Sequence, residues 1–244
     1  MSNILLLSYN GTEYLEHDEE AKFKIIVNTW NNEVESYPHD NEVVVYSETQ
    51  RLGEVMWIQS KVLRDLKIDY DHVCVYCHDV KLKVSDVNKL FEIGTTKGYD
   101  SYTPAMTSKN HSHKQFIKNG DEDEPTDWVE NMASFFSKRM YDKIIPYLDL
   151  FYGELNLISG WGLDTPLARD IIKDNGYKCM IINSIVMEHT KAVTSGAKKW
   201  RNGLSSQEIY DFMIEYLELG QPKSKLEYIR ELSKGEPPTY TIKS

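Results

Sequence analysis

The sequence predicts an α/β fold, in which a mostly parallel, mixed sheet is flanked by helices and followed by a helical C-terminal extension. Short apolar runs rich in β-branched residues alternate with helical patterns through residues 1–200, whereas residues 201–244 carry helical patterns alone. Strands separated by helices indicate a parallel sheet that is covered on both faces. The chain has 244 residues, of which 41% are hydrophobic, which suits one such domain with a small appendix.

Apolar runs of strand length define the expected sheet. These runs lie at residues 3–8, 24–28, 42–47, 73–77, 101–105, 132–136 and 180–186. We expect the first half of the domain, residues 1–80, to bind a nucleotide and the second half, residues 81–200, to bind an acceptor. Ligands of such sheets bind outside the carboxyl ends of the strands, which directs attention to the residues that follow each run.

The expected helices have recognisable starts and stops. Residues 54–66 repeat apolar side chains at helical spacing, and Ser85 is a candidate N-cap for a helix that ends before Gly98. Ser137 is a candidate N-cap for the next helix, which Pro146 should kink or end.

Two more helix patterns follow later in the chain. Pro166, directly after Thr165, is a start signal, and Gly176 is the matching stop signal. In the C-terminal extension, Ser205 and Glu208 form a capping box ahead of an apolar stripe. A second helix is expected over residues 223–233, and residues 236–244 are expected to be a loose end.

Bulk charge and cysteine content exclude several classes of protein. The formal net charge of −10 argues against a partner bound mainly through non-specific attraction to phosphates. No apolar run approaches the roughly 20 residues that span a bilayer, and residues 1–9 do not read as a secretory signal. Three cysteines favour reduced thiols, and hence a cytoplasmic location.

An acidic residue, Asp79, follows the apolar run 73–77 directly after His78. A carboxylate at the carboxyl end of a central strand is suited to hold Mg²⁺ or Mn²⁺, which prefer oxygen ligands and share them with substrate phosphates. Such a cation stabilises the charge of a departing diphosphate. The alternative is that Asp79 only ends the strand.

The segment 158–164 combines Gly160, Trp161 and Gly162 with the carboxylate of Asp164. An indole beside a carboxylate suits a sugar, since the ring covers C–H groups and the carboxylate accepts from a hydroxyl. The same carboxylate could act as a general base. The alternative is that Asp164 only stabilises the start of the helix that follows.

Three further features lie near the expected site. His189 follows the last predicted strand, and Lys191, Lys198, Lys199 and Arg201 come after it in a stretch that could close over a diphosphate or remain a solvated loop. Trp128 and Glu130 precede the run 132–136, where they could line an acceptor pocket. Trp128 could equally be a core residue.

Taken in order, these motifs resemble the GT-A glycosyltransferases. Residues 70–80 resemble the strand and DxD-type motif, residues 126–133 resemble a Gly-Trp-Val-Glu-Met-Met-Ala segment, and residues 160–164 match Gly-Trp-Gly-Leu-Asp. The pattern is closest to a plant and microbial family whose strand ends in Trp-Asp-Glu-Asp, and a chlorella-virus glycosyltransferase domain is also similar. The resemblance covers roughly residues 70–196.

The resemblance implies a Rossmann-like GT-A fold and a metal-assisted, inverting transfer of a sugar from a nucleoside diphosphate donor, such as a UDP-sugar, to an acceptor hydroxyl. It assigns Asp79 and His189 to the Mn²⁺ or Mg²⁺ ion, and Asp164 to the role of general base. The acceptor residues would be Trp128, Glu130, Gly160 and Trp161. The donor residues would be Ser8, Tyr9, Lys61, Cys77, His78, Asp79 and Lys198.

One departure from the family pattern leaves alternatives open. Cys77 stands where the DxD motif has its first Asp, and a thiol is a poor ligand for a hard cation. A non-catalytic protein that binds nucleotide sugars is therefore an alternative. The acceptor is a glycan, a glycoprotein or a small molecule, and a hydroxymethylated base in DNA, flipped into the pocket, is a further alternative. The oligomeric state stays open.

Overall fold

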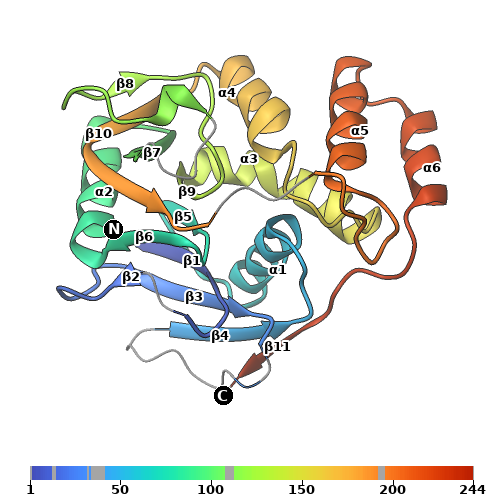
Figure 1. Cartoon of the computed structure of the whole chain (residues 1–244), viewed down its shortest axis with the longest axis horizontal. Coiled ribbons are helices and arrows are strands. Elements are labelled where there is room, and N and C mark those ends of the chain that lie inside the picture. The colour runs from blue at the N-terminus through green and yellow to red at the C-terminus, as the bar shows by residue number, and fades with distance from the viewer. Residues whose placement is uncertain are drawn as a thin grey trace.

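A mixed sheet forms the centre of the molecule (Figure 1). The computed structural model describes residues 2–12, 15–31, 33, 42–107, 113–191 and 196–243. The strand order is β11-β4-β3-β1-β5-β9-β7-β10-β6-β2, and β8 pairs with β10. The strands are β1 (Asn3–Tyr9), β2 (Leu15–Glu16), β3 (Lys24–Thr29), β4 (Glu42–Ser47), β5 (His72–Tyr76), β6 (Val80–Lys83), β7 (Ser101–Met106), β8 (Glu124–Pro125), β9 (Ala133–Ser137), β10 (Cys179–His189) and β11 (Tyr240–Lys243).

The predicted strands are confirmed, with ends that shift by a few residues. β4, β3, β1 and β5 are parallel neighbours, as the alternation of strands and helices predicts. β9 runs antiparallel between β5 and β7, and β10 is parallel to β7. The largest difference is β10, which continues past residue 186 because its last residues pair with β6. This extension brings His189 opposite Val80.

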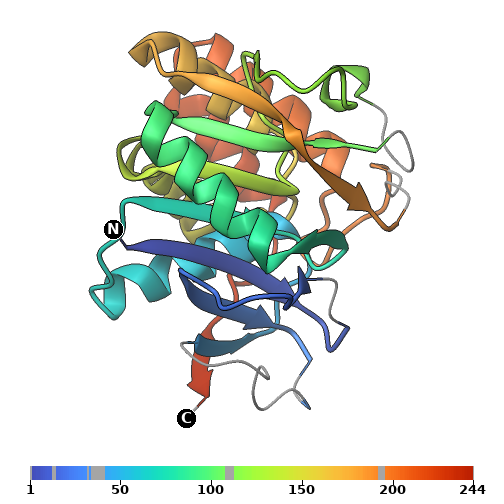
Figure 2. The same cartoon turned by 90° about the vertical axis from the view of Figure 1, so that its left-hand side faces the viewer.

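Helices cover both faces of the sheet. They are α1 (Leu52–Asp65), α2 (Val84–Lys97), α3 (Lys138–Leu148), α4 (Arg169–Asn175), α5 (Ser206–Glu218) and α6 (Lys223–Leu232). Figure 2 shows α2 lying across one face, while α1, α3 and α4 pack on the other. Two apolar cores result, one under α2 and a larger one that includes side chains of α1, α3 and α5.

The expected start of α2 is wrong, and α3 continues past Pro146. α2 starts after Lys83, and the Ser85 hydroxyl donates to Asp18 Oδ2 at 2.7 Å instead of capping the helix. Pro146 does not end α3, because the Asp149 N–H bonds back to the carbonyls of Ile145 and Pro146 and the helix runs on to Leu148. A π-helical turn, Asp149–Glu154, then follows.

The helix start expected at Pro166 is also displaced. Thr165 has an extended conformation, with φ −141° and ψ 124°, and interrupts a π-helical segment, Leu163–Ala168. The regular helix α4 begins only at Arg169. Gly98 and Gly176, by contrast, end α2 and α4 in the left-handed conformation that glycine adopts most readily, as expected.

The C-terminal residues do not form a loose end. Ser205 and Glu208 make the predicted capping box of α5. After α6, however, β11 pairs antiparallel with β4 and covers an edge of the sheet whose ladder groups would otherwise be unpaired. The Tyr240 hydroxyl also donates to Asp65 at the end of α1. Within the described stretches of the chain, no helix is long and apolar enough to cross a bilayer.

Candidate active site

The candidate site lies at the carboxyl ends of β1 and β5, beside the end of β10. The Ser8 hydroxyl accepts from the His78 N–H and donates to the Tyr76 carbonyl, both at 3.0 Å. The Asp79 carbonyl accepts from the Thr190 N–H at 2.8 Å. The Ser8 contacts hold the turn after β5 against β1, and the Thr190 contact holds it against the end of β10. Ser8 thus helps to position His78, and its contact with the donor stays a prediction.

Asp79 and His189 form a pair at this position. The Asp79 Oδ2 and His189 Nε2 atoms are 3.4 Å apart, and both side chains are mostly buried. Burial alone would raise the pKa of Asp79, but the hydrogen bond from His189 and the charges of His78 and His189 hold it below its ordinary value. Asp79 is therefore ionised at neutral pH.

A second pair of carboxyl groups lies next to this one. Burial raises the pKa of Asp164 to about 6, although the N–H groups of Thr165, at 2.8 Å, and of Asn131 stabilise its charge. Burial, together with the charge of Asp164, raises the pKa of Glu130 to about 8, and the charge of His189 acts on Glu130 in the opposite direction. Glu130 thus lies close to both Asp164 and His189. The three residues expected at the centre of the site share one region.

The donor atoms at Asp79 and His189 fit a divalent cation. Two ligands at about 2.1 Å from an octahedral ion, at right angles, are about 3 Å apart, close to the observed separation. Mg²⁺ at phosphate sites is commonly held by one or two protein ligands, with substrate phosphates and water completing the shell. No cluster of three His, Cys, Asp or Glu side chains that could hold a metal exists among the residues described. Phosphate oxygens and water would therefore have to supply the remaining ligands.

Arg51, at the N-cap of α1, is a site residue that the sequence analysis missed. Its charge interacts with Asp79 and with His78. Its guanidinium carbon lies 4.3 Å from the centroid of the Trp200 ring, and the Lys198 ammonium lies 5.2 Å from the same ring. The sequence did contain a signal for Arg51. It is a cation in the loop between β4 and α1, and such a loop lies at the carboxyl edge of the sheet, where ligands bind.

Aromatic side chains gather at the ends of β1 and β3. Trp30 follows β3 and meets the His78 ring edge-on, with centroids 5.2 Å apart. The paired positions Tyr9 and Thr29 place the ends of the two strands side by side. The Lys191 ammonium lies 2.9 Å from His78 Nε2. Trp30 is a second residue that the sequence analysis missed, and it gives this corner a flat surface suited to a nucleobase.

The segment with Gly160, Trp161 and Gly162 is fixed by close packing. A Cβ atom on Gly160 would lie 3.3 Å from the Gly53 nitrogen, so the loop lies directly against the first turn of α1. Gly162 has φ +96° and faces Met213 of α5. Trp161 is 37% exposed and packs against Gly196. The indole is therefore available to a ligand.

Trp128 lies in an aromatic cluster. Its ring is 4.9 Å from that of Phe116 and 5.2 Å from that of His113, both nearly perpendicular. It is half-buried against the core under α2. Its packing against the core confirms the core reading of Trp128 in part, and its place in an acceptor pocket stays a prediction.

Cys77 has a structural contact. Its Sγ donates to the Asn131 carbonyl at 3.2 Å, and burial raises the pKa of the thiol well above its ordinary value. The sulfur is therefore a neutral thiol and not a thiolate ligand. It ties the end of β5 to the loop that carries Glu130.

The remaining expected cations are dispersed. Lys61 lies ten residues beyond Arg51, about 15 Å along α1, with its ammonium 5.5 Å from the Trp57 ring. Lys199 bonds to Glu208, and Arg201 pairs with the fully buried Glu54. Lys199 and Arg201 are thus paired with acidic residues of the protein, and the closing of this stretch over a diphosphate stays a prediction. Residues 192–195 of the proposed lid lie outside the described chain.

Comparisons with known proteins support the fold class. No protein-family model matches the chain, and no curated protein matches it by sequence. Its fold is similar to that of GalNAc-T7 in a crystal structure with UDP, GalNAc and Mn²⁺, with a TM-score of 0.53 and 11% identity over 88% of this chain and 47% of that chain. The chain therefore spans about half the length of that protein.

Two weaker matches have TM-scores below 0.5. A197 from STIV has a TM-score of 0.41 and 14% identity over 78% of this chain and 85% of that chain. S. aureus TarS 1–349 has a TM-score of 0.45 and 10% identity over 78% of this chain and 60% of that chain. The likeness to GalNAc-T7 confirms the predicted α/β fold of the GT-A type and, at this identity, concerns the fold alone. The particular family within that group stays a prediction.

Proposed function

We propose that this protein is a metal-assisted, inverting glycosyltransferase that moves a sugar from a nucleoside diphosphate sugar to an acceptor hydroxyl. The observation that carries the proposal is the grouping of the Asp79–His189 pair with Glu130 and Asp164 at the carboxyl edge of the sheet. GalNAc-T7, which has a similar fold, was crystallised with UDP, GalNAc and Mn²⁺, which supports a uridine nucleotide and Mn²⁺ as the first ligands to test.

The donor would lie along the ends of β3, β1 and β5. Trp30 and Tyr9 offer a surface for the base, and Arg51 offers a guanidinium for the diphosphate. Asp79 and His189 would hold the Mn²⁺ or Mg²⁺ ion. Such an ion, when bound, stabilises the negative charge of the diphosphate leaving group.

Asp164 is the general base in this proposal. With a pKa of about 6 it is mainly ionised at pH 7, yet basic enough to accept a proton from an acceptor hydroxyl. The acceptor oxygen forms its bond to the anomeric carbon as its proton passes to Asp164. The bond from that carbon to the diphosphate oxygen breaks, and its electron pair leaves with the diphosphate.

Glu130 has a different role, because its pKa of about 8 keeps it protonated at neutral pH. A protonated carboxyl group donates a hydrogen bond and does not compete with Asp164 for the proton. We assign it to the positioning of the acceptor, together with the exposed indole of Trp161. These groups suit a sugar hydroxyl of a glycan, a glycoprotein or a small molecule. DNA is disfavoured as acceptor because Lys199 and Arg201 form internal ion pairs.

The test is a panel of nucleotide sugars with Mn²⁺ and a mixture of acceptor sugars, in which release of nucleoside diphosphate is measured alongside calorimetric binding of UDP, GDP and CDP. Turnover with at least one donor is the expected result. Tight nucleotide binding with no turnover across the panel would favour the non-catalytic alternative. Absence of any nucleotide binding would overturn both.

A further inference from the structure

The residues that lead into α5 lie against the loop that carries Arg51. This loop joins β4 to α1, whereas Trp200 and Arg201 come much later in the sequence, shortly before α5. The two segments nevertheless meet, because the Arg51 guanidinium carbon lies 4.3 Å from the centroid of the Trp200 ring. The start of the C-terminal extension is thus in contact with a residue of the candidate donor site.

Arg201 fixes the backbone on both sides of Arg51. Its Nη1 atom donates to the Glu48 carbonyl at 3.4 Å and to Glu54 Oε2 at 3.1 Å. Its backbone N–H donates to Gln50 Oε1 at 3.2 Å. Glu54, which is fully buried, also accepts from the Gln50 N–H at 2.7 Å. The loop therefore has a defined position relative to residues 200–201.

The Trp200 ring is a rigid support for the Arg51 side chain. Trp200 is only 9% exposed and belongs to the larger apolar core. Its indole N–H donates to the Ser206 hydroxyl at 3.1 Å, and its backbone N–H donates to the Leu204 carbonyl at 2.9 Å. The indole cannot turn away without losing this packing and the bond to Ser206. The ring face that meets Arg51 is therefore held in place.

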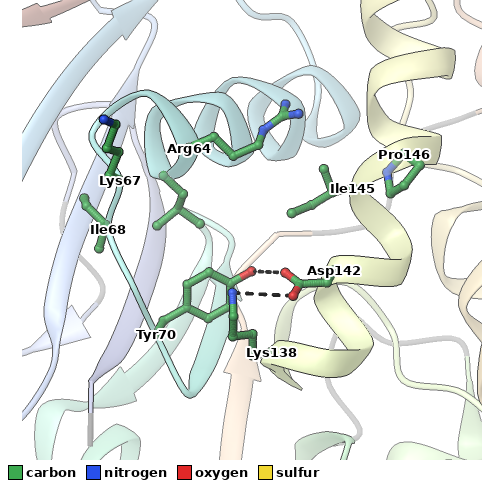
Figure 3. Close-up of a pocket in the computed structure, with 9 residues that line it drawn as sticks. Arg64, Lys67, Ile68, Tyr70, Lys138, Asp142, Ile145 and Pro146 are labelled. Carbon is green, nitrogen blue, oxygen red and sulfur yellow. Dashed lines mark hydrogen bonds and ion pairs between the residues drawn. The ribbon is translucent and has the colours of Figure 1, made fainter.

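A ring face holds an arginine differently from a carboxylate. The aromatic face attracts the guanidinium without neutralising its charge and without using its N–H donors. Arg64, near the other end of α1, shows the contrast (Figure 3). It donates to both carboxylate oxygens of Asp149, at 2.6 and 2.7 Å, and its charge is neutralised. The charge of Arg51, in contrast, acts on Asp79 and His78 at the candidate metal site.

We propose that Trp200 is a positioning residue of the donor site, whose indole orients the Arg51 guanidinium towards the diphosphate; this inference rests on the proposed function. An arginine side chain loses rotamer freedom when it binds a ligand, and an indole that already holds it reduces that loss. The Lys198 ammonium, 5.2 Å from the same ring, adds a second positive charge that suits a diphosphate. Residues just before α5 thus contribute to donor binding.

The first experiment measures the binding of UDP and of uridine by calorimetry, each in the presence of Mn²⁺. Trp200→Met places a flexible apolar side chain in the space but removes the ring face. It should weaken UDP binding by about threefold to tenfold, the range expected for one cation–π contact, and change uridine binding little. Trp200→Phe restores a ring and should recover most of the loss. Equal losses for UDP and uridine would show that Trp200 supports only the fold, and would overturn the proposal.

Trp57→Met is the matched control. Trp57 is buried to a similar degree, at 7% exposed, and its ring also has a cation nearby, the Lys61 ammonium at 5.5 Å. It lies six residues beyond Arg51, about 9 Å along α1. UDP affinity should be unchanged in this variant. A loss equal to that of Trp200→Met would indicate general destabilisation and contradict a specific role for Trp200.

A double variant tests whether Trp200 acts through Arg51. Trp200→Met combined with Arg51→Ala should bind UDP as weakly as Arg51→Ala alone, because the indole then has no guanidinium to orient. Two independent contributions would instead add. Additive losses in the double variant would therefore overturn the proposal.

Nuclear magnetic resonance of the unaltered protein decides the matter if Trp200→Met does not fold. The Arg51 Nε–H signal, identified by its loss in Arg51→Ala, should be shifted upfield by the indole ring current and should move when UDP binds with Mg²⁺. A signal without the ring-current shift, or one that bound UDP leaves in place, would contradict the proposal. Failure of the unaltered protein to bind UDP would overturn the proposed function together with this inference. UDP affinity that is unchanged in a folded Trp200→Met protein would overturn this inference alone.

Discussion

The Nε2 atom of His189 lies 3.4 Å from the Oδ2 atom of Asp79, although the two residues come from distant parts of the sequence. Their proximity does not depend on attraction between the side chains. β10 pairs with β6 at His189 and Val80, and the Thr190 N–H bonds to the Asp79 carbonyl. The backbone thus presents both side chains to the same point, as a shared metal site requires.

The role of Asp164 as base predicts a loss of rate without a loss of donor binding. Asp164→Asn should lower kcat by about 10²- to 10⁴-fold, because the amide cannot accept the acceptor proton. Calorimetric affinity for UDP with Mn²⁺ should stay close to that of the unaltered protein. Asp174→Asn, at an exposed position of α4, is the matched control and should have full activity. Unaltered turnover in Asp164→Asn would remove the assigned base.

The pKa values of Asp164 and Glu130 predict a bell-shaped profile of kcat/KM against pH. The rate should fall as the pH drops below about 6, where Asp164 becomes protonated and can no longer accept a proton. It should fall again above about 8, where Glu130 loses its proton and places a second negative charge beside Asp164. Glu130→Gln should keep the acid limb and lose the alkaline limb. An alkaline limb that persists in this variant would assign it to another group.

The position of Arg51 predicts a specific loss of donor affinity. Arg51→Ala should weaken UDP binding by about tenfold to a hundredfold, since it removes a charge-assisted contact to the diphosphate. Binding of free uridine, which has no phosphate, should change little. Arg64→Ala, near the other end of α1, serves as the control. Equal losses for UDP and uridine would show that Arg51 acts on the fold of the site and not on the diphosphate.

The buried pair of Glu54 and Arg201 predicts a large effect on stability. Glu54 is fully buried, and burial raises its pKa while the contact with Arg201 opposes that shift. Arg201→Ala should therefore lower the free energy of unfolding by about 3–5 kcal/mol, because the carboxylate loses its partner. Lys225→Ala removes a more exposed pair with Glu215 and should cost less than about 1 kcal/mol. Similar costs for both, measured by urea denaturation, would contradict the importance of burial.

Local patterns were sufficient to predict most of the fold. Apolar runs predicted the central strands, and Ser205 with Glu208 predicted the start of α5. Each of these patterns depends on contacts between residues that are close in the sequence. Gly98 and Gly176 marked helix ends for the same reason. Thr165 is the exception. The sequence pattern favours a helix start there, but the residue has an extended conformation and follows a loop that packs against α1 at Gly160.

Features that depend on distant partners could not be predicted from local patterns. β11 forms by pairing with the edge strand β4. The sequence of residues 236–244 does not indicate which strand these residues pair with. For Arg201 the sequence left a diphosphate contact and a solvated loop both open, and neither pattern indicates its ion pair with Glu54, far away in the sequence. Arg51 was missed because its loop carries no recognisable motif. Glu130 was expected near the acceptor, but its raised pKa could not be predicted, because it arises from burial and from the charge of Asp164, which is distant in the sequence.

A crystal structure of the complex with UDP and Mn²⁺, with anomalous diffraction recorded at the manganese edge, tests the central claim most directly. The account predicts one anomalous peak about 2.1 Å from both the Asp79 carboxylate and the His189 imidazole, with the diphosphate beside Arg51. Mn²⁺ and UDP bound elsewhere, with Asp79 and His189 still in contact only with each other, would contradict it.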